Sequence, residues 1–272
     1  MHRYWIAALL LMVRPALAED LMEVYRQAQA SDPVFAGARA RHAAGIERLP
    51  QGRALLLPNV NLSASRTEND QRVITPTLDA GQRFSADSYG LTLIQPLYRK
   101  QNFASYAQSG AQAQEAEFEI EAARQNLILR VAEAYFGVLG AQDSYDYSVR
   151  EKTAIERLLT LARRNFSVGT TSLVDVHEAE ARLDTARAQE IAAATDLEAR
   201  RETLRTLTGQ APCPLTRLKR LDPRPPEPMD PEKWAEAAQR KNPTVHARDQ
   251  ALVAAREEIE KNRAGHYPTL DL

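Results

Sequence analysis

Cysteine is nearly absent from the sequence: Cys213 stands alone, which excludes an intramolecular disulfide. Aromatic residues make up only 6% of the chain and glycines number 11, so a conventional globular core is disfavoured and elongated packing of helix on helix is favoured. The formal net charge of −1 gives no indication of a nucleic-acid partner. At 26% charged and 44% hydrophobic residues, the composition is that of a folded protein.

Motifs of catalysis and of metal or cofactor binding are also missing. The histidines are scattered, and the sequence has no H-E-x-x-H, no cysteine pair, no G-x-S-x-G and no glycine-rich phosphate loop. His177 beside Glu178 is predicted to lie on a solvated helix face. A run of acidic residues is likewise predicted to lie on the surface: Glu115, Glu117, Glu119 and Glu121. We therefore expect no enzyme activity, no catalytic residue, no metal site and no cofactor.

Residues 1–18 are predicted to be a secretory signal peptide. A basic start precedes an apolar run at residues 5–13 that is too short to span a membrane, and an A-x-A motif ends at Ala18. Cleavage is expected between Ala18 and Glu19. The alternative for this segment is a buried helix.

The chain contains no proline between Pro96 and Pro212, and this stretch predicts two long helices. Apolar residues recur every three or four positions from Arg99 to about Phe166, and again up to Gly209. Arms of roughly 65 and 35 residues far exceed the average globular helix of about 11 or 12. Residues 99–210 are therefore predicted to form an antiparallel coiled-coil hairpin with its tip near residues 167–171. Alanine is frequent along the apolar stripe, which favours close approach of helix axes or reflects helix propensity alone.

A change of periodicity at Pro58 predicts a β-hairpin over residues 58–98. Val60, Leu62 and Ala64 alternate with polar residues, a polar loop is expected from about residue 70 to 85, and a second strand from 86 to 98. Strands of roughly 11 to 13 residues suit the tilted span of an outer-membrane barrel, which needs about 9 to 11. A soluble hairpin that caps the coiled coil is the alternative.

Residues 19–57 are predicted to form N-terminal helices, the second of which begins with Asp32 as N-cap and Pro33 at its first position and runs toward Ala54. Residues 211–229 form a proline-rich linker. The pattern of residues 20–62 then returns 210 positions later, with about ten identities where chance gives about three. The matching pairs are Asp20 and Asp230, Ala28 and Ala238, Gln29 and Gln239, Pro33 and Pro243, Ala44 and Ala254, Glu47 and Glu257, Arg53 and Arg263, Ala54 and Ala264, Pro58 and Pro268, and Leu62 and Leu272. Residues 230–272 are expected to be the start of a second, truncated repeat.

Three stretches carry a family resemblance. Residues 19–28 are EDLMEVYRQA, residues 165–169 are NFSVG and precede Asp175 and Val176, and residues 265–272 are GHYPTLDL. Together with the repeat, they resemble the TolC-like outer-membrane efflux proteins over the chain from Glu19 to its last residue.

The resemblance implies a mainly α fold with a membrane β-hairpin. A long antiparallel helical hairpin would form the α-barrel part, and the two strands would join a trimeric outer-membrane β-barrel. The implied function is that of an exit duct in a tripartite efflux or type I secretion system, a passive route for drugs or proteins from a pump to the exterior. The implied partners are two further copies in a homotrimer, a periplasmic adaptor, an inner-membrane pump and outer-membrane lipid. The implied location is the outer membrane, with helices extending into the periplasm, and the chain is expected to be a fragment that forms no working duct alone.

The resemblance also assigns roles at the tip. It implies a gate role for Asp175, although the hydroxyl residue that often precedes this aspartate in the family is replaced here by Val174. It implies adaptor contact through Val168, Gly169 and Thr170. Independently, Ser172 and Asp175 fit the S-x-x-D capping box of a helix start, and the two roles of Asp175 are compatible.

A periplasmic adaptor or structural coiled-coil protein of an export system is the alternative function. An adaptor would need β-rich segments on both sides of one helical hairpin. The duplication and the β-hairpin that precedes the long helices favour the conduit.

Overall fold

The computed structural model describes residues 18–75, 77–211, 213–218 and 225–272. The predicted signal peptide therefore lies outside the described residues, apart from Ala18. The chain divides into two compact units, one of Met1–Ala38 and Ala123–Met229 and the other of Arg39–Ala122 and Asp230–Leu272.

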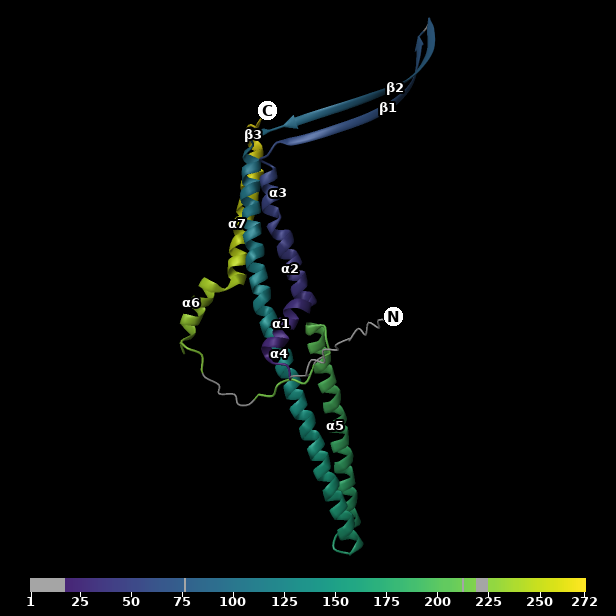
Figure 1. Ribbon diagram of the computed structural model, residues 1–272, viewed down its shortest axis with the longest axis vertical. Coiled ribbons are helices and arrows are strands. Elements are labelled where there is room, and N and C mark those ends of the chain that lie inside the picture. Colours follow the sequence, from purple (N-terminus) through teal and green to yellow (C-terminus); the bar gives the residue numbers. More distant parts are fainter. Residues whose placement is uncertain (1–17, 76, 212, 219–224) are drawn as a thin grey trace, which may run out of the picture. The chain divides into compact units, whose positions relative to one another are not determined.

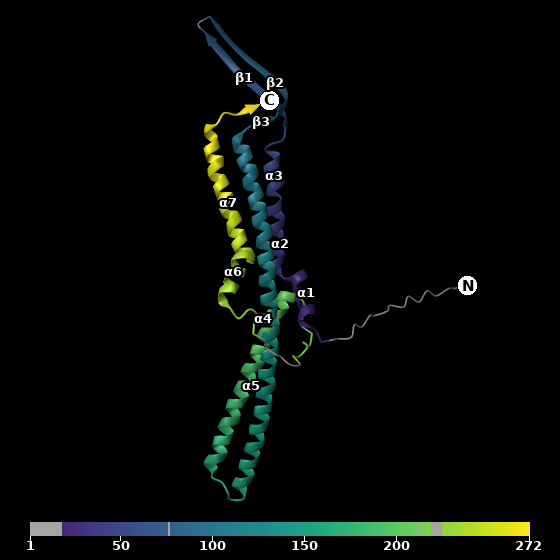
Figure 2. The ribbon, with the colours of Figure 1, turned by 90° about the vertical axis from the view of Figure 1, so that its left-hand side faces the viewer.

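The first unit contains the helical hairpin. Helix α4 (Lys100–Ser167, 68 residues) contributes its second part, and α5 (Leu173–Thr208, 36 residues) returns beside it (Figure 2). Both helices end within about two residues of the expected positions, and α5 stops at Gly209 in the left-handed conformation with φ 71°. The two helices are joined by an apolar seam of Leu159, Val176 and Leu183, flanked by an ion pair of 2.7 Å between Lys152 and Glu190.

Helix α1 (Leu21–Ser31) packs against α5 in the same unit. Val24 and Ala28, one helical turn apart, are fully buried on its inner face. Helix α2 (Pro33–Ile46) then starts as predicted, because the Asp32 carboxylate accepts a hydrogen bond of 2.8 Å from the Phe35 backbone N–H.

The second unit shows that the expected continuous helix from Pro33 to Ala54 is wrong. Helix α2 ends at Ile46, and a separate helix α3 (Arg48–Ala54) follows a break at Glu47. The cause is Pro50, which lacks a backbone N–H and whose ring clashes with the carbonyl of the residue four positions earlier in a continuous helix.

The second unit also contains α6 (Pro231–Lys241), α7 (Pro243–Arg263) and a short 3-10 turn at Ala264–His266. The starts of α6 and α7 lie 210 residues after positions 21 and 33, where α1 and α2 begin. Helix α7 contacts the first part of α4 through Gln108 and Glu258, at 2.7 Å, and through Phe118 and His246, whose ring centroids are 5.1 Å apart. Across the described part of the chain, every helix is too short or too polar to cross a bilayer.

The β-hairpin of the second unit is longer than expected. Strands β1 (Asn59–Thr75) and β2 (Leu78–Ile94) pair in antiparallel register from Asn59 opposite Ile94 to Thr75 opposite Leu78 (Figure 1). The predicted loop over residues 70–85 is therefore wrong. Its polar side chains form cross-strand ion pairs instead, such as Asp70 with Arg83 at 2.6 Å. Strand β3 (Pro96–Tyr98) pairs with β4 (Leu270–Asp271).

Candidate functional site at the tip of the helical hairpin

The tip loop is built on the C-terminal cap of α4. The Thr170 N–H donates to the Asn165 carbonyl at 2.9 Å and the Gly169 N–H to the Phe166 carbonyl at 3.0 Å, the pair of bonds that defines a Schellman motif. Gly169 has φ +79°, a backbone conformation that residues other than glycine rarely adopt. The position of the turn is therefore set by Gly169.

The predicted contact residues differ in what they present to solvent. Val168 is 68% exposed, and a side chain at Gly169 would meet open space. The Thr170 hydroxyl is used internally, because it donates to the Asn165 carbonyl at 3.0 Å. Just beyond the turn, Val174 is 72% exposed, so the tip offers apolar side chains to water.

Helix α5 begins with a capping box. The Asp175 N–H donates to Ser172 Oγ at 3.3 Å, and the Asp175 carboxylate accepts from both the backbone N–H and the hydroxyl of Ser172 at 2.8 Å. The hydrogen bond from the Ser172 N–H, followed by that from its hydroxyl, lowers the pKa of Asp175. Among the described residues Asp175 makes no ion pair, so any cationic partner would have to come from another segment or chain.

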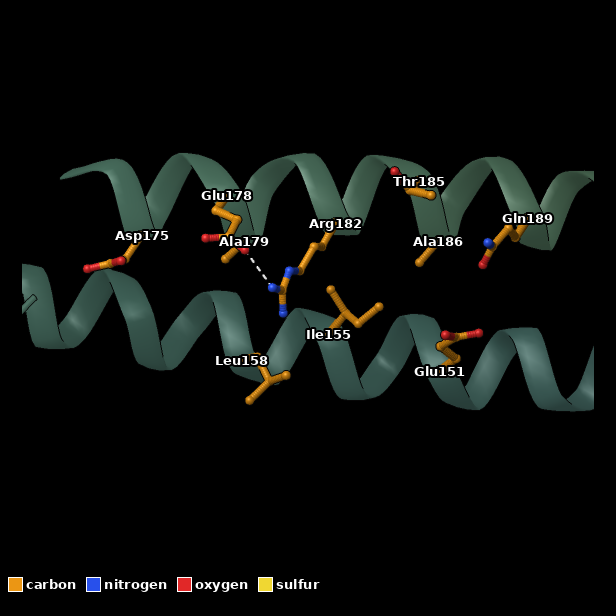
Figure 3. A pocket seen from close by; sticks show the side chains of 10 residues that line it. All are labelled: Glu151, Ile155, Leu158, Asp175, Glu178, Ala179, Arg182, Thr185, Ala186 and Gln189. Atoms are coloured by element: carbon orange, nitrogen blue, oxygen red, sulfur yellow. Dashed lines mark hydrogen bonds and ion pairs between the residues drawn. The ribbon is translucent and has the colours of Figure 1, made fainter. Parts of the chain in front are cut away.

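An open groove of ≈ 480 Å³ runs from Asp175 along the facing sides of α4 and α5 (Figure 3). Its floor is apolar, with Ile155 and Ala179 packed on the hairpin seam, and Arg182 extends into it while paired with Glu178. Sequence reasoning did not identify this groove. The four-residue spacing of Glu178 and Arg182 on one helix face was its only signal.

An ion pair connects the two helices near the tip. Arg163 of α4 donates to Glu180 of α5 at 2.8 Å, and His177 lies 3.1 Å from the same carboxylate. The hydrogen bond from Arg163 is the main reason why the pKa of Glu180 lies below its usual range.

Far along the chain from the tip, a buried ion pair joins α2 to α4. Asp32 is only 2% exposed, and Arg130 donates two hydrogen bonds to its carboxylate, at 2.6 and 3.1 Å. Burial alone would raise the pKa of Asp32, but the Arg130 guanidinium and the Phe35 N–H together lower it. Sequence reasoning identified Asp32 only as an N-cap, because nothing in the local pattern indicates a partner 98 residues away.

The residues on either side of the predicted cleavage site are held against the linker. Glu19 forms a parallel bridge with Leu215, in which the Thr216 N–H donates to the Glu19 carbonyl at 3.0 Å. The Thr216 hydroxyl donates to the Ala18 carbonyl at 3.1 Å, and the buried Tyr135 hydroxyl donates to the Thr216 carbonyl at 2.9 Å.

A long helical hairpin joined to a long antiparallel β-hairpin is a fold that this chain shares with solved structures of outer-membrane channels. Solved structures with this fold include the CmeC outer membrane channel of Campylobacter jejuni, with a TM-score of 0.78 at 17% identity over 92% of this chain and 54% of that chain. At this identity the likeness concerns the fold alone.

The sequence comparison identifies the family of the chain. The family model of the outer membrane efflux proteins matches residues 24–210, and the chain belongs to this family. It is 35% identical over 259 residues to the outer membrane protein TolC of Vibrio cholerae, which covers 94% of this chain. It is 34% identical over 274 residues to the alkaline protease secretion protein AprF of Pseudomonas aeruginosa, which covers 98% of this chain. In both cases the match covers 57% of the relative, so the chain spans about half the length of the relatives it matches.

These findings decide several of the expectations from the sequence. The predicted family is confirmed, and so are the mainly helical fold class and the outer-membrane location.

Proposed function

We propose that this protein is a subunit of an outer-membrane exit duct that serves efflux or type I secretion. The observation that carries the proposal is the family match over residues 24–210, which takes in the β-hairpin, both long helices and the tip. Two relatives described as secretion proteins, AprF and PrtF of Dickeya chrysanthemi, support a role in protein export.

The proposal assigns a cellular location to each part of the chain. The β-hairpin at residues 58–98 inserts into the outer membrane, and the helical hairpin at residues 99–210 extends into the periplasm. Three copies assemble around the transport path. A periplasmic adaptor docks at the tips and connects the duct to an inner-membrane pump, so transport through the duct itself is passive.

The tip supplies the adaptor contact in this scheme. The exposed side chains of Val168 and Val174 and the open backbone at Gly169 suit an apolar contact with a partner helix. The groove beside Asp175 extends this surface along the hairpin.

Assembly is tested by extracting the outer membrane of a Gram-negative host that produces a two-repeat channel carrying this sequence. Heat-resistant trimers in the outer-membrane fraction, detected on gels run with and without boiling, support the proposal. Monomers confined to the periplasmic fraction would contradict it.

For Asp175 we propose a gate role in addition to the capping role, and the two can be separated by charge. In a two-repeat channel that carries this sequence, Asp175→Asn keeps a hydrogen-bonding oxygen and removes the charge. If Asp175 only caps, helix stability falls by about 0.3 to 1 kcal/mol and conductance is unchanged. If it also holds a cation in the closed state, a charge-assisted bond of about 1.5 to 3 kcal/mol is lost, and the open fraction rises about ten-fold or more.

The matched control is Asp184→Asn. Asp184 is exposed on the same helix, and among the described residues its ion pair is local, with Arg187 at 3.2 Å. Planar-bilayer recordings at low and high salt compare the two variants. Equal open fractions for Asp175→Asn, Asp184→Asn and the unmodified channel would remove the gate role.

A further inference from the structure

All the charged residues of the long β-hairpin lie on one of its two faces. The register places Arg66 opposite Asp87 and Asp70 opposite Arg83, and by alternation these pairs share a face with Glu68. The opposite face is uncharged and mostly polar, with pairs such as Asn61 and Thr92 or Ser65 and Ser88, although it also carries Phe84 and Ile94.

The charged face changes character along its length. At the base of the hairpin the same face presents only apolar and aromatic side chains, which are 61 to 81% exposed: Val60, Leu62, Tyr89, Leu91 and Leu93. One step beyond the Ala64 and Tyr89 pair, the ion pairs begin with Arg66 and Asp87 at 3.8 Å. They continue toward the turn with Arg83 and Asp70 at 2.6 Å and Arg72 and Asp79 at 2.7 Å.

The apolar part has the length of one bilayer crossing. Residues 88–98 contain no charged side chain, and tyrosines stand at both ends of this window, at Tyr89 and Tyr98. From Tyr89 to Tyr98 the chain passes through the end of β2, Gln95 and β3, and its extended length is about 30 Å at 3.3 Å per residue, or about 23 Å vertically at a tilt of about 40°. The apolar band of outer-membrane barrels is about 25 Å tall and is flanked by aromatic girdles on both sides.

Charged residues follow this window directly in the sequence, after Tyr98. Arg99 is ion-paired with Asp271, and the Lys100 ammonium lies 3.8 Å from the ring centroid of Tyr267. Within the window, the Gln95 side-chain amide donates to the carbonyls of Leu56 and Pro96, so this polar group is satisfied internally.

We propose that the lipid contact of this hairpin extends from Tyr98 to the Ala64 and Tyr89 pair, and that the ion-paired section beyond it stands in water outside the membrane. The inference rests on the proposed function, which puts the hairpin in the outer membrane. Lipid acyl chains are the occupant of the apolar face, because an exposed apolar belt bounded by tyrosines and then by charges on both sides matches the layering of a bilayer. An arginine facing lipid at the midplane disfavours insertion by about 30-fold or more, so a section with three of them does not lie in hydrocarbon.

Nitroxide labels at single cysteines test the boundary. The background variant is Cys213→Ser, and the full chain is reconstituted in phospholipid vesicles. Labels at Leu62→Cys and Leu91→Cys should collide mainly with oxygen, which concentrates in hydrocarbon. Labels at Glu68→Cys and Ser85→Cys, on the same face beyond the boundary, should collide mainly with a water-soluble nickel chelate.

Each of the other outcomes would contradict a different part of the proposal. Oxygen preference at all four positions would overturn the boundary and leave the membrane hairpin intact. Nickel preference at Leu62→Cys and Leu91→Cys would overturn both the boundary and the membrane position. Low accessibility to both reagents at these two positions would show that protein, such as a second copy, covers the face instead of lipid.

A pair of charge substitutions gives an independent measurement. Leu91→Arg should lower the ratio of membrane-bound to alkali-extractable protein by about 30-fold, and Ser85→Arg should change it by less than about two-fold. Equal losses for both variants would overturn the proposal.

Discussion

The two copies of the duplicated segment keep the same plan but not the same packing. Helices α1 and α6 both have 11 residues and both follow an aspartate, Asp20 in one case and Asp230 in the other. Helix α1 buries Val24 and Ala28, whereas α6 has no buried residue among those described. The two copies therefore share the aspartate that precedes the helix and differ in which side chains of the helix are buried.

The second helix of each copy shows the same contrast at single positions. The N-cap of α2 is Asp32, buried and ion-paired, and the N-cap of α7 is the exposed Asn242, which accepts a hydrogen bond from the Thr244 N–H at 2.9 Å. Gly52 faces Ser109 at close range, and its counterpart Asn262 is exposed. Exchanging residues between the copies tests whether neighbours account for these differences.

The largest effect is expected for Gly52→Asn. A Cβ atom at this position would lie 2.4 Å from Ser109 Oγ and 3.3 Å from the Tyr106 Cα, so α3 would be pushed away from α4. We expect the free energy of unfolding to fall by about 3 kcal/mol or more. The reverse exchange, Asn262→Gly, changes an exposed side chain near a helix end and should cost less than about 1 kcal/mol. Urea unfolding followed by circular dichroism measures both, and similar losses would contradict this account of the copies.

A smaller loss is expected for Asp32→Asn, which gives the first copy the cap of the second. Asparagine still caps the helix, but Arg130 loses its charged partner, so the free energy of unfolding should fall by about 1.5 to 3 kcal/mol at pH 7. Asn242→Asp is the control and should change it by no more than about 0.5 kcal/mol.

The pH dependence of the same pair follows from the lowered pKa of Asp32. A carboxyl whose pKa is lower in the folded state stabilises fully above its unfolded pKa, near 4, and loses this contribution as the pH falls through the folded value. The difference between the unmodified chain and Asp32→Asn should therefore shrink below about pH 4. A difference that stays constant down to pH 2 would rule out the ion pair as its source.

The smallest effect is expected for Pro50→Glu, which places the second copy's residue, Glu260, in the first. The backbone N–H gained at position 50 can bond to the Ile46 carbonyl and close the break at Glu47. Stability should change by no more than about 1 kcal/mol. Amide exchange at residues 47–51 should slow, and unchanged exchange there would show that Pro50 does not cause the break.

The long helices could be predicted because their signals are local. Helix-forming composition acts along the helix itself, and the capping box at Ser172 and the glycine at position 209 lie next to the helix ends that they define. The strand section over residues 70–85 was mistaken for a loop because its side chains are polar. Only the register reveals that Asp70 faces Arg83 and that Arg72 reaches Asp79.

The buried pair of Asp32 and Arg130 and the groove beside Asp175 had no comparable signal. Both depend on which helix faces meet, and this is set by packing between residues far apart in sequence. Sequence patterns could therefore indicate the tip residues and the helix caps, but not the partners that lower the pKa of a buried carboxylate.

The bridge between Glu19 and Leu215 has a consequence for the order of events during folding. The hydrogen bond from the Thr216 N–H to the Glu19 carbonyl joins residues about 200 positions apart, whereas α4 and α5 meet across a short tip loop. Because the entropy lost on closing a loop grows with its length, we expect the helical hairpin to form early and this bridge to form late. We expect the backbone around the predicted cleavage site to remain accessible to a signal peptidase while the long helices assemble.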